Sequence, residues 1–239
     1  MKDRSSHLET KQLAATQAAR LVENGMIVGI GTGSTLAFVI EELGRRVREE
    51  GLRVIGVPTS FQSRVLCTKL GIPLRDMQDA AYLDLAIDGA DEVDPALDLI
   101  KGGGASHTRE KIVAAMAEKF VVVVDESKLV PALGTGFAIP VEVLPVARMC
   151  VERALREAGA TPALRMAAAG KDGPVVTDNG QLILDVRFPP ATDLRKADQQ
   201  MHQIPGVIET GLFFDLAKSV LVGGSGKGGP TVRTLTRSR

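Results

Sequence analysis

The first 130 residues alternate short apolar runs with segments in which apolar residues recur at helical spacing. Runs of this kind suit strands that are buried on both faces, and a helix between two strands is the usual connection in a parallel sheet. This part of the chain therefore predicts an α/β fold built on an open, mainly parallel sheet. The predicted strands are Met26–Ile30, Val54–Val57, Leu83–Ile87 and Phe120–Val124, and the first helix is expected over Thr10–Glu23.

A different pattern begins near Pro131. Two helical segments, Val146–Glu157 and Asp193–His202, alternate here with short apolar runs. One pair of runs flanks Thr177-Asp178-Asn179-Gly180, and an Asn-Gly turn between apolar runs is a strong hairpin signal. The resulting βαββαβ order predicts a smaller α+β domain inserted into the larger one.

The chain after this insertion is expected to complete the main sheet. Ser219–Val222 has the composition of a strand, and the glycine-rich stretch Gly223–Gly229 predicts a loop. We therefore expect one domain over residues 1–133 plus 212–239, and a small domain over residues 134–211.

Charge and composition narrow the class of function. Lys plus Arg and Asp plus Glu number 29 each among 239 residues, whereas nucleic-acid binders usually carry a basic excess. No apolar run reaches membrane-spanning length, and the charged N-terminus does not fit a signal peptide. The two cysteines, Cys67 and Cys150, form no spaced motif, which suits a reducing compartment. These features predict a cytoplasmic protein that acts on a small molecule, with no nucleic-acid or membrane partner.

Every candidate reactive group in the first half follows a predicted strand, where open α/β sheets bind ligands. The first such segment, Gly29–Thr35, lacks the third glycine of a dinucleotide fingerprint and the lysine of a P-loop. What remains is a glycine-rich turn with hydroxyl residues at a helix N-terminus, where backbone amides and the helix dipole favour phosphate. A turn whose Ser or Thr merely caps the helix fits the residues equally well.

The acidic segment Asp88–Asp94 follows the third predicted strand. A solvated acidic loop or a cation site would also account for it, although the spacing of a calcium loop is absent. Its position, however, places Asp88 and Asp91 at the mouth of the ligand crevice. Carboxylates crowded there should repel one another and raise the pKa of at least one of them, which suits proton transfer near neutral pH.

The segment Lys101–Lys111 combines a lysine, three successive glycines and a carboxylate at the start of a helix. A surface lysine and an exposed helix residue would be the simplest interpretation of Lys101 and Glu110. The glycines cost backbone entropy, however, and make sense where a substrate approaches the main chain closely. We interpret His107 as a helix-start residue rather than a catalyst, and the histidines lie too far apart in sequence to predict a metal cluster.

Taken in order, these segments resemble the ribose-5-phosphate isomerases of the A type. The resemblance extends over nearly the whole chain and rests on several motifs in the right order. It implies a Rossmann-like open, mainly parallel sheet with an inserted smaller α+β, ferredoxin-like domain. The matching segments are Gly31–Thr35, Asp88–Glu92, Lys101–Gly104, Arg109–Lys111, Asp125–Lys128, Pro140–Pro145, Val176–Gly180 and Ile204–Val207.

The resemblance also implies roles for single residues. Glu110 matches the family's catalytic base, and Asp88, Asp91 and Lys101 are the other catalytic candidates. The chain departs from the family at Ser106-His107, where relatives usually have small or apolar residues. The matched substrate-binding residues are Lys11, Thr32, Gly33, Ser34, Thr35, Asp88, Gly89, Ala90, Asp91, Lys101, Gly102, Gly103, Gly104 and Lys128.

The implied reaction interconverts D-ribose 5-phosphate and D-ribulose 5-phosphate in the non-oxidative pentose phosphate pathway. Asp88 would move the ring-oxygen proton, and Glu110 would carry a proton between C2 and C1 through a cis-enediolate. Lys101, nearby amides and a protonated Asp91 would stabilise the charge that develops on oxygen. The resemblance implies no metal or other cofactor, a sugar phosphate as the partner molecule, and a homodimer or homotetramer.

Two other classes of function remain open at this point. The first is a non-catalytic sugar-phosphate sensor, which is expected to carry a basic DNA-binding domain. Because the chain begins almost directly with its first predicted helix, we do not expect such a domain here. An amino-sugar phosphate isomerase or a lactonase on a related fold is the second alternative.

Overall fold

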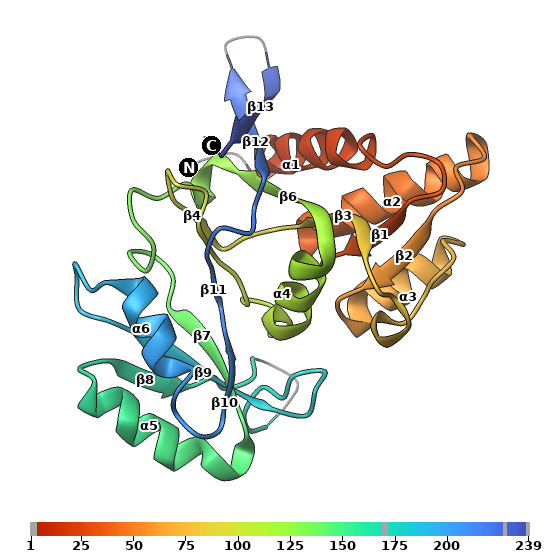
Figure 1. The fold of residues 1–239 in the computed structure, drawn as a ribbon. Helices are drawn as coiled ribbons and strands as arrows, with labels where there is room; N and C mark the ends of the chain where they lie inside the picture. The colour runs from red at the N-terminus through yellow and green to blue at the C-terminus, as the bar shows by residue number, and fades with distance from the viewer. Residues whose placement is uncertain (1–3, 169–171, 227–228, 238–239) are drawn as a thin grey trace. The chain divides into compact units, whose positions relative to one another are not determined.

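The computed structural model describes residues 4–168, 172–226 and 229–237. The backbone forms two compact units (Figure 1). The predicted domain bounds at residues 133 and 212 stay a prediction. The parallel-sheet unit contains Met1–Ala90, Arg109–Leu129 and Asp215–Arg239, and the antiparallel-sheet unit contains Asp91–Thr108 and Val130–Phe214.

Within its described residues, the parallel-sheet unit has a six-stranded sheet in the order β13-β12-β6-β3-β1-β2. All neighbouring pairs are parallel except β12 and β13, which are antiparallel. The prediction of a mainly parallel α/β sheet is confirmed. The strands are β1 (Ile27–Ile30), β2 (Ile55–Pro58), β3 (Leu83–Asp88), β6 (Ala117–Asp125), β12 (Ser219–Gly226) and β13 (Gly229–Thr236).

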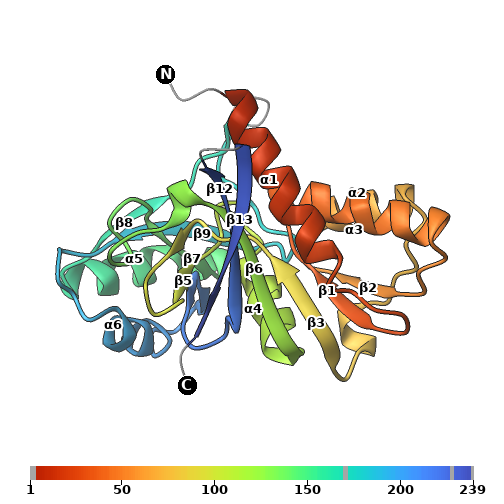
Figure 2. The same cartoon turned by 90° about the horizontal axis from the view of Figure 1, so that it is seen from above.

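Helices cover both faces of this sheet (Figure 2). Val28 and Ile30 of β1 belong to a core shared with helices α1, α2 and α3. The alternate residue, Gly29, faces α4 on the opposite side, where a Cβ atom would stand 2.2 Å from Cγ1 of Val113. The helices are α1 (Arg4–Ala19), α2 (Ser34–Glu49), α3 (Phe61–Lys69) and α4 (His107–Met116), with short 3₁₀ turns η1 (Met77–Asp79) and η2 (Glu126–Lys128).

Two details of this unit differ from the expectations. The first helix extends from Arg4 to Ala19 instead of from Thr10 to Glu23. The expected loop over Gly223–Gly229 is wrong for its described residues, because Gly223–Gly226 complete β12 and Gly229 begins β13, while residues 227 and 228 lie outside the described chain. The glycine composition has a packing cause, since a Cβ atom on Gly223 would stand 2.5 Å from the carbonyl oxygen of Thr10 in α1.

The antiparallel-sheet unit contains the predicted βαββαβ order. Its four-stranded sheet has the order β10-β7-β9-β8, and every neighbouring pair is antiparallel. Helices α5 and α6 contribute Val151 and Met201 to a core with Val141 and Leu184 of the sheet. The elements are β7 (Ile139–Val143), η3 (Pro145–Ala147), α5 (Arg148–Glu157), β8 (Thr161–Leu164), β9 (Leu182–Arg187), α6 (Leu194–Met201) and β10 (Val207–Thr210).

The predicted hairpin is present as a turn with a short first arm. The Thr177 N–H donates to the Gln181 carbonyl at 2.9 Å, which closes the turn. Before the turn, Val176 makes only an isolated bridge with Leu182. Because β9 pairs with β7 and β8 on its two edges, it has no free edge for a longer partner.

A second, smaller sheet carries part of the predicted site. It has the order β11-β5-β4 and is antiparallel throughout. Ile100 and Leu212 of this sheet lie in the same core as the four-stranded sheet. The strands are β4 (Glu92–Val93), β5 (Leu99–Ile100) and β11 (Leu212–Phe213).

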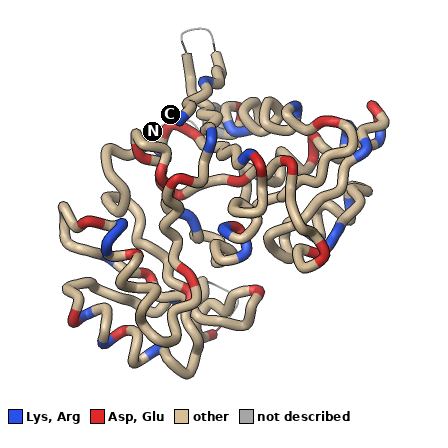
Figure 3. The backbone as a smooth tube through the Cα atoms, viewed as in Figure 1, with Lys and Arg blue, Asp and Glu red and all other residues tan. Residues whose placement is uncertain are grey.

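Acidic and basic residues are interspersed along both units (Figure 3). Of the helices that the structure describes, none is long and apolar enough to cross a membrane.

Each unit contains one of the two cysteines. Cys67 of α3 is fully buried in the core, and this burial raises the pKa of its thiol to about 12. Cys150 of α5 is exposed.

Candidate active site

Asp88 lies at the carboxyl end of β3, as the sequence predicts, and is 3% exposed. Its Oδ1 atom accepts hydrogen bonds from the N–H groups of Gly89 at 2.7 Å and Thr32 at 3.2 Å. Thr32 follows β1, which is the neighbour of β3 in the sheet. The carboxylate and the glycine-rich turn, far apart in sequence, therefore meet at the ends of adjacent strands.

The glycine-rich turn is lined with hydroxyl groups. Thr32 Oγ1 lies 2.9 Å from Thr59 Oγ1 and donates to Ser60 Oγ at 2.7 Å. Gly33 is the N-cap of α2, with a φ of 108° that favours glycine, and within the described residues α2 has no side-chain cap. The interpretation that Ser or Thr of this turn merely caps α2 is therefore wrong, and the Thr32 hydroxyl bonds to the following βα turn instead.

Glu110 occupies the first turn of α4, where the helix dipole favours a carboxylate. It is 5% exposed, and Lys101 is 3% exposed. The simpler interpretation of these two residues as solvated surface groups is wrong. A buried carboxylate and a buried ammonium are costly unless they are paired or have a chemical function.

Lys101 directly follows β5 in the antiparallel-sheet unit. Its N–H donates to the Gly211 carbonyl at 2.9 Å, and its Nζ atom lies 5.5 Å from the centroid of the Phe213 ring. Both contacts come from the segment around β11. This segment therefore holds the lysine backbone by a hydrogen bond and the ammonium group by a cation–π contact.

Asp91 and the three glycines form one hydrogen-bonded loop in the same unit. Asp91 Oδ2 accepts from the Gly103 N–H at 2.8 Å, and a Cβ atom on Gly103 would stand 2.7 Å from Asp91 Oδ1. Gly102 has a φ of 112°, which an L side chain rarely adopts. Glycine is therefore required at position 102 by its backbone conformation and at position 103 by the close approach of Asp91.

His107 is the first residue of α4 and is fully buried. Its Nε2 atom lies 3.2 Å from the Glu209 carbonyl oxygen, and its ring lies against Gly102. These contacts support its interpretation as a helix-start residue.

Lys11 and Lys128, both predicted to bind substrate, lie near Asp125 at the end of β6. Lys11 Nζ is 3.4 Å from Asp125 Oδ2, and Asp125 caps the 3₁₀ turn that ends at Lys128. Burial alone would raise the pKa of Asp125, but hydrogen bonds from Ser127 and the charge of Lys11 outweigh it and lower the pKa.

The four predicted catalytic groups are divided between the two units. Asp88 and Glu110 belong to the parallel-sheet unit, whereas Asp91 and Lys101 belong to the antiparallel-sheet unit. The chain passes between the units after Ala90 and after Thr108, so Asp88 is three residues from Asp91 and Glu110 is two residues beyond the second crossing.

Sequence reasoning did not identify two buried carboxylates that shape these segments. Glu142 of β7 is fully buried and accepts from the hydroxyls of Thr108 and Thr177, the latter at 2.7 Å, and from Asn179 Nδ2 at 3.1 Å. Glu92 of β4 is 2% exposed and accepts three backbone N–H bonds from the segment 134–137, each 2.6 Å long. For Glu142 the available signal was a lone acid within a short apolar strand, whereas Glu92 was one acid of the segment Asp88–Asp94.

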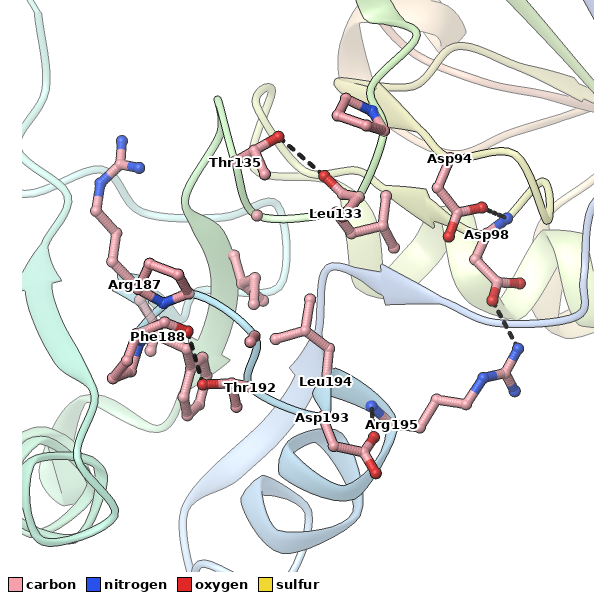
Figure 4. A pocket seen from close by; sticks show the side chains of 18 of the residues that line it. Asp94, Asp98, Leu133, Thr135, Arg187, Phe188, Thr192, Asp193, Leu194 and Arg195 are labelled. Carbon is pink, nitrogen blue, oxygen red and sulfur yellow. Dashed lines mark hydrogen bonds and ion pairs between the residues drawn. The ribbon is translucent and has the colours of Figure 1, made fainter.

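A pocket of about 530 Å³ lies in the antiparallel-sheet unit between segments 131–135 and 186–195 (Figure 4). Several of its polar side chains bond to one another or to nearby backbone. Arg195 donates to Asp98 at 2.6 Å and lies over the Phe214 ring, and the Thr192 hydroxyl donates to the Pro189 carbonyl at 2.7 Å. None of the predicted site residues is among the described residues that line this pocket.

Comparison with known proteins assigns the family. Residues 55–227 match the family model of ribose 5-phosphate isomerase A (phosphoriboisomerase A). A curated ribose-5-phosphate isomerase A from Thermosynechococcus vestitus is 56% identical over 228 residues, which cover 95% of this chain and 96% of the relative.

Solved structures agree with this assignment. The ribose 5-phosphate isomerase A of Methanocaldococcus jannaschii has a TM-score of 0.88 at 48% identity and covers 95% of this chain and 98% of its own. A D-ribose-5-phosphate isomerase in complex with phospho-erythronic acid has a TM-score of 0.90 at 43% identity, with coverage of 96% and 98%. The chain therefore belongs to the ribose 5-phosphate isomerase A family.

Proposed function

We propose that Glu110 is the base through which this isomerase moves a proton between C2 and C1 of its sugar phosphate. The family membership makes the chain an aldose–ketose isomerase that interconverts D-ribose 5-phosphate and D-ribulose 5-phosphate. The observation that carries the proposal is the burial of Glu110 in the first turn of α4. A carboxylate held away from water can exchange a proton with carbon without competition from bulk solvent.

The proposed reaction begins with ring opening. Asp88 is the candidate for the ring-oxygen proton, because its carboxylate is buried and oriented by the N–H groups of Gly89 and Thr32. Glu110 then removes the C2 proton and returns it to C1 through a cis-enediolate. A positioned base of this kind contributes about 10²–10⁴-fold to the rate.

The negative charge that develops on oxygen requires donors. We assign this role to Lys101, to the amides of Gly102 and Gly104, and to a protonated Asp91, whose Oδ2 atom accepts from the Gly103 N–H. The burial of Lys101 strengthens its interaction with an oxyanion, because water screens it little. Loss of one such donor typically costs about 3–4 kcal/mol of transition-state stabilisation.

The phosphate group is assigned to the turn Thr32–Thr35. The Thr32 hydroxyl of this turn makes hydrogen bonds with the hydroxyls of Thr59 and Ser60. Helix α2 begins at the turn with Gly33 as its N-cap and has no side-chain cap. A helix N-terminus of this kind attracts phosphate through its amides and its dipole. Lys11 and Lys128 are proposed as the accompanying cations. Phospho-erythronic acid, the compound in the related structure, carries a phosphate group as the sugar substrate does.

The decisive experiment supplies ribose 5-phosphate, glucosamine 6-phosphate and 6-phosphogluconolactone in parallel. Formation of ribulose 5-phosphate alone is expected. Turnover of either of the other two compounds in place of ribose 5-phosphate would favour the amino-sugar isomerase or the lactonase. Tight binding of ribose 5-phosphate without turnover would favour the sensor.

We also propose that the chain assembles into a homodimer or homotetramer. Val146 of η3 and Met149 of α5 are 96% and 61% exposed, and apolar patches on a surface often mark protein–protein interaction sites. Light scattering coupled to gel filtration should give a mass of two or four chains, and a single-chain mass would contradict the proposal.

A cytoplasmic location is proposed as well. Its support is that the chain has only two cysteines, which lie in different units, one buried and one exposed. Cell fractionation with a tagged chain should recover it with cytoplasmic markers.

A further inference from the structure

Arg165 lies just after β8 in the antiparallel-sheet unit, and its side chain is 13% exposed. Its Nε and Nη2 atoms donate to the two carboxylate oxygens of Asp185 on β9, a bidentate pair. The remaining nitrogen, Nη1, donates to the Gly102 carbonyl oxygen at 2.7 Å, with the Gly103 carbonyl oxygen at 3.3 Å. Arg165 therefore links the four-stranded sheet to the glycine loop.

The Gly102 carbonyl and the Gly103 N–H belong to the same planar peptide group and point in opposite directions. The N–H side of this group donates to Asp91 Oδ2 at 2.8 Å. One peptide is thus held by Arg165 at one end and by Asp91 at the other. Rotation of the peptide away from Arg165 would necessarily turn its N–H away from Asp91.

Within the loop, the Ala105 N–H donates to the same Gly102 carbonyl oxygen at 3.0 Å, and Arg165 adds a charged donor from outside the loop. Three successive glycines have wide backbone freedom, and Gly102 already adopts a φ of 112°. A guanidinium charge at the carbonyl also polarises the peptide, which makes its N–H a stronger donor. Asp185 in turn fixes the guanidinium plane.

We propose that Arg165 is a positioning residue for Asp91: supported by Asp185, it fixes the Gly102–Gly103 peptide and thereby the direction of the Asp91 carboxylate. The inference rests on the proposed function, in which Asp91 is a catalytic group. Arg165 itself touches no reacting atom in this scheme. A purely structural ion pair would need only Asp185, whereas the third donor on the loop carbonyl is the feature that relates Arg165 to catalysis.

The test is a double-mutant cycle between the two residues. Arg165→Gln should lower kcat by roughly 10²-fold, the scale of loss when a reacting group is misplaced by about 1 Å. Asp91→Asn should also be slow. The double variant Asp91→Asn/Arg165→Gln should be no slower than Asp91→Asn alone, because Arg165 then has no carboxylate to position. Arg153→Gln is the matched control, since Arg153 is 75% exposed and pairs only loosely with Glu157 on α5.

Further variants guard against a simple loss of folding. Thermal unfolding of each variant is measured first, and if Arg165→Gln does not fold, Arg165→Lys and Asp185→Asn take its place in the same cycle. Arg165→Lys keeps the charge but not the fork and should recover part of the rate. The inference would be overturned if the Arg165 variants had the kcat of the parent enzyme. It would also be overturned if the fold-losses in kcat of the two single variants multiplied in the double variant.

Failure of the underlying proposal is distinguishable. If Asp91→Asn turns over at the parent rate, the assignment of Asp91 in the proposed function is wrong, and the inference on Arg165 is overturned with it. If Asp91→Asn is slow while Arg165→Gln is normal, only the inference fails.

Discussion

The carboxylate of Asp88 occupies the space that a side chain on Gly31 would need, since a Cβ atom at position 31 would stand 2.0 Å from Asp88 Oδ1. Gly31 has no positive φ, so the requirement for glycine there is steric rather than conformational. The Asp88 carboxylate, and not only the binding of a phosphate, therefore requires glycine at position 31 of the turn.

We expect Gly31→Ala to lower kcat strongly, because Asp88 must move to admit the new methyl group. The control is Gly44→Ala in α2, where the new Cβ atom would stand 2.7 Å from Leu70 Cβ. This control should lower the melting temperature and leave kcat near the parent value. Equal losses of kcat in both variants would show that instability, and not Asp88, is the cause.

Glu110→Gln should lower kcat by about 10²–10⁴-fold, since the amide cannot accept the C2 proton. Binding of phospho-erythronic acid, measured by calorimetry, should change little because the shape and the phosphate contacts are kept. Glu118→Gln, at an exposed position on β6, is the control. Near-normal turnover in Glu110→Gln would exclude Glu110 as the base.

Activity should survive dialysis against EDTA. In the proposed reaction side chains move the protons, and Lys101 with backbone amides stabilises the oxyanion. The initial rate of ketose formation is measured before and after chelation. A loss that Mg²⁺ or Zn²⁺ restores would contradict this expectation.

Glu92→Ala should lower the free energy of unfolding by about 2–3 kcal/mol, because three backbone N–H groups lose a charged acceptor. All three donors lie in the segment 134–137. Urea unfolding measures the change, with Glu157→Ala as an exposed control in the same unit. A change below about 0.5 kcal/mol, ordinary for a surface site, would refute the role of this carboxylate.

His202 should make stability depend on pH near neutrality. A hydrogen bond to Glu209 at 2.8 Å, opposed by burial and assisted by Asp198, raises its pKa from 6.5 to about 8. Because the folded-state pKa is raised, the stabilisation is fully present below about pH 6.5 and is lost as the pH rises through about 8. The stability difference between the parent and His202→Gln should therefore shrink from pH 6 to pH 9, and a constant difference would contradict the assignment.

The sequence predicted the helices and strands whose apolar residues recur at a regular spacing along the chain. Asp88 was located correctly because a buried strand is easily recognised and its last residue must lie at the sheet edge. Gly223–Gly226 was misassigned because its strand character depends on the approach of the Thr10 carbonyl, a distant contact. The bonds of Glu142 to Thr108 and Thr177 could not be predicted for the same reason, since they join residues 34 and 35 positions apart.

The division of the catalytic candidates between two units likewise has no local signal. Asp88 and Asp91 belong to one acidic segment in the sequence, yet the unit boundary falls between Ala90 and Asp91. The pairing of β4 with β5, and the bond from the Asp91 N–H to the Ile100 carbonyl, join Asp91 to the antiparallel-sheet unit. The position of a candidate residue such as Asp88 was therefore predictable, but the structural supports of the candidates were not.

The unequal environments of the two cysteines provide a built-in chemical reporter. At neutral pH a thiol with a pKa of about 12 in a closed core is almost unreactive, so an alkylating reagent should label Cys150 in the native protein and leave Cys67 unmodified. Labelling of Cys67 then requires the core of the parallel-sheet unit to open. Mass spectrometry of the two peptides over time would thus follow the opening of that unit without any engineered probe.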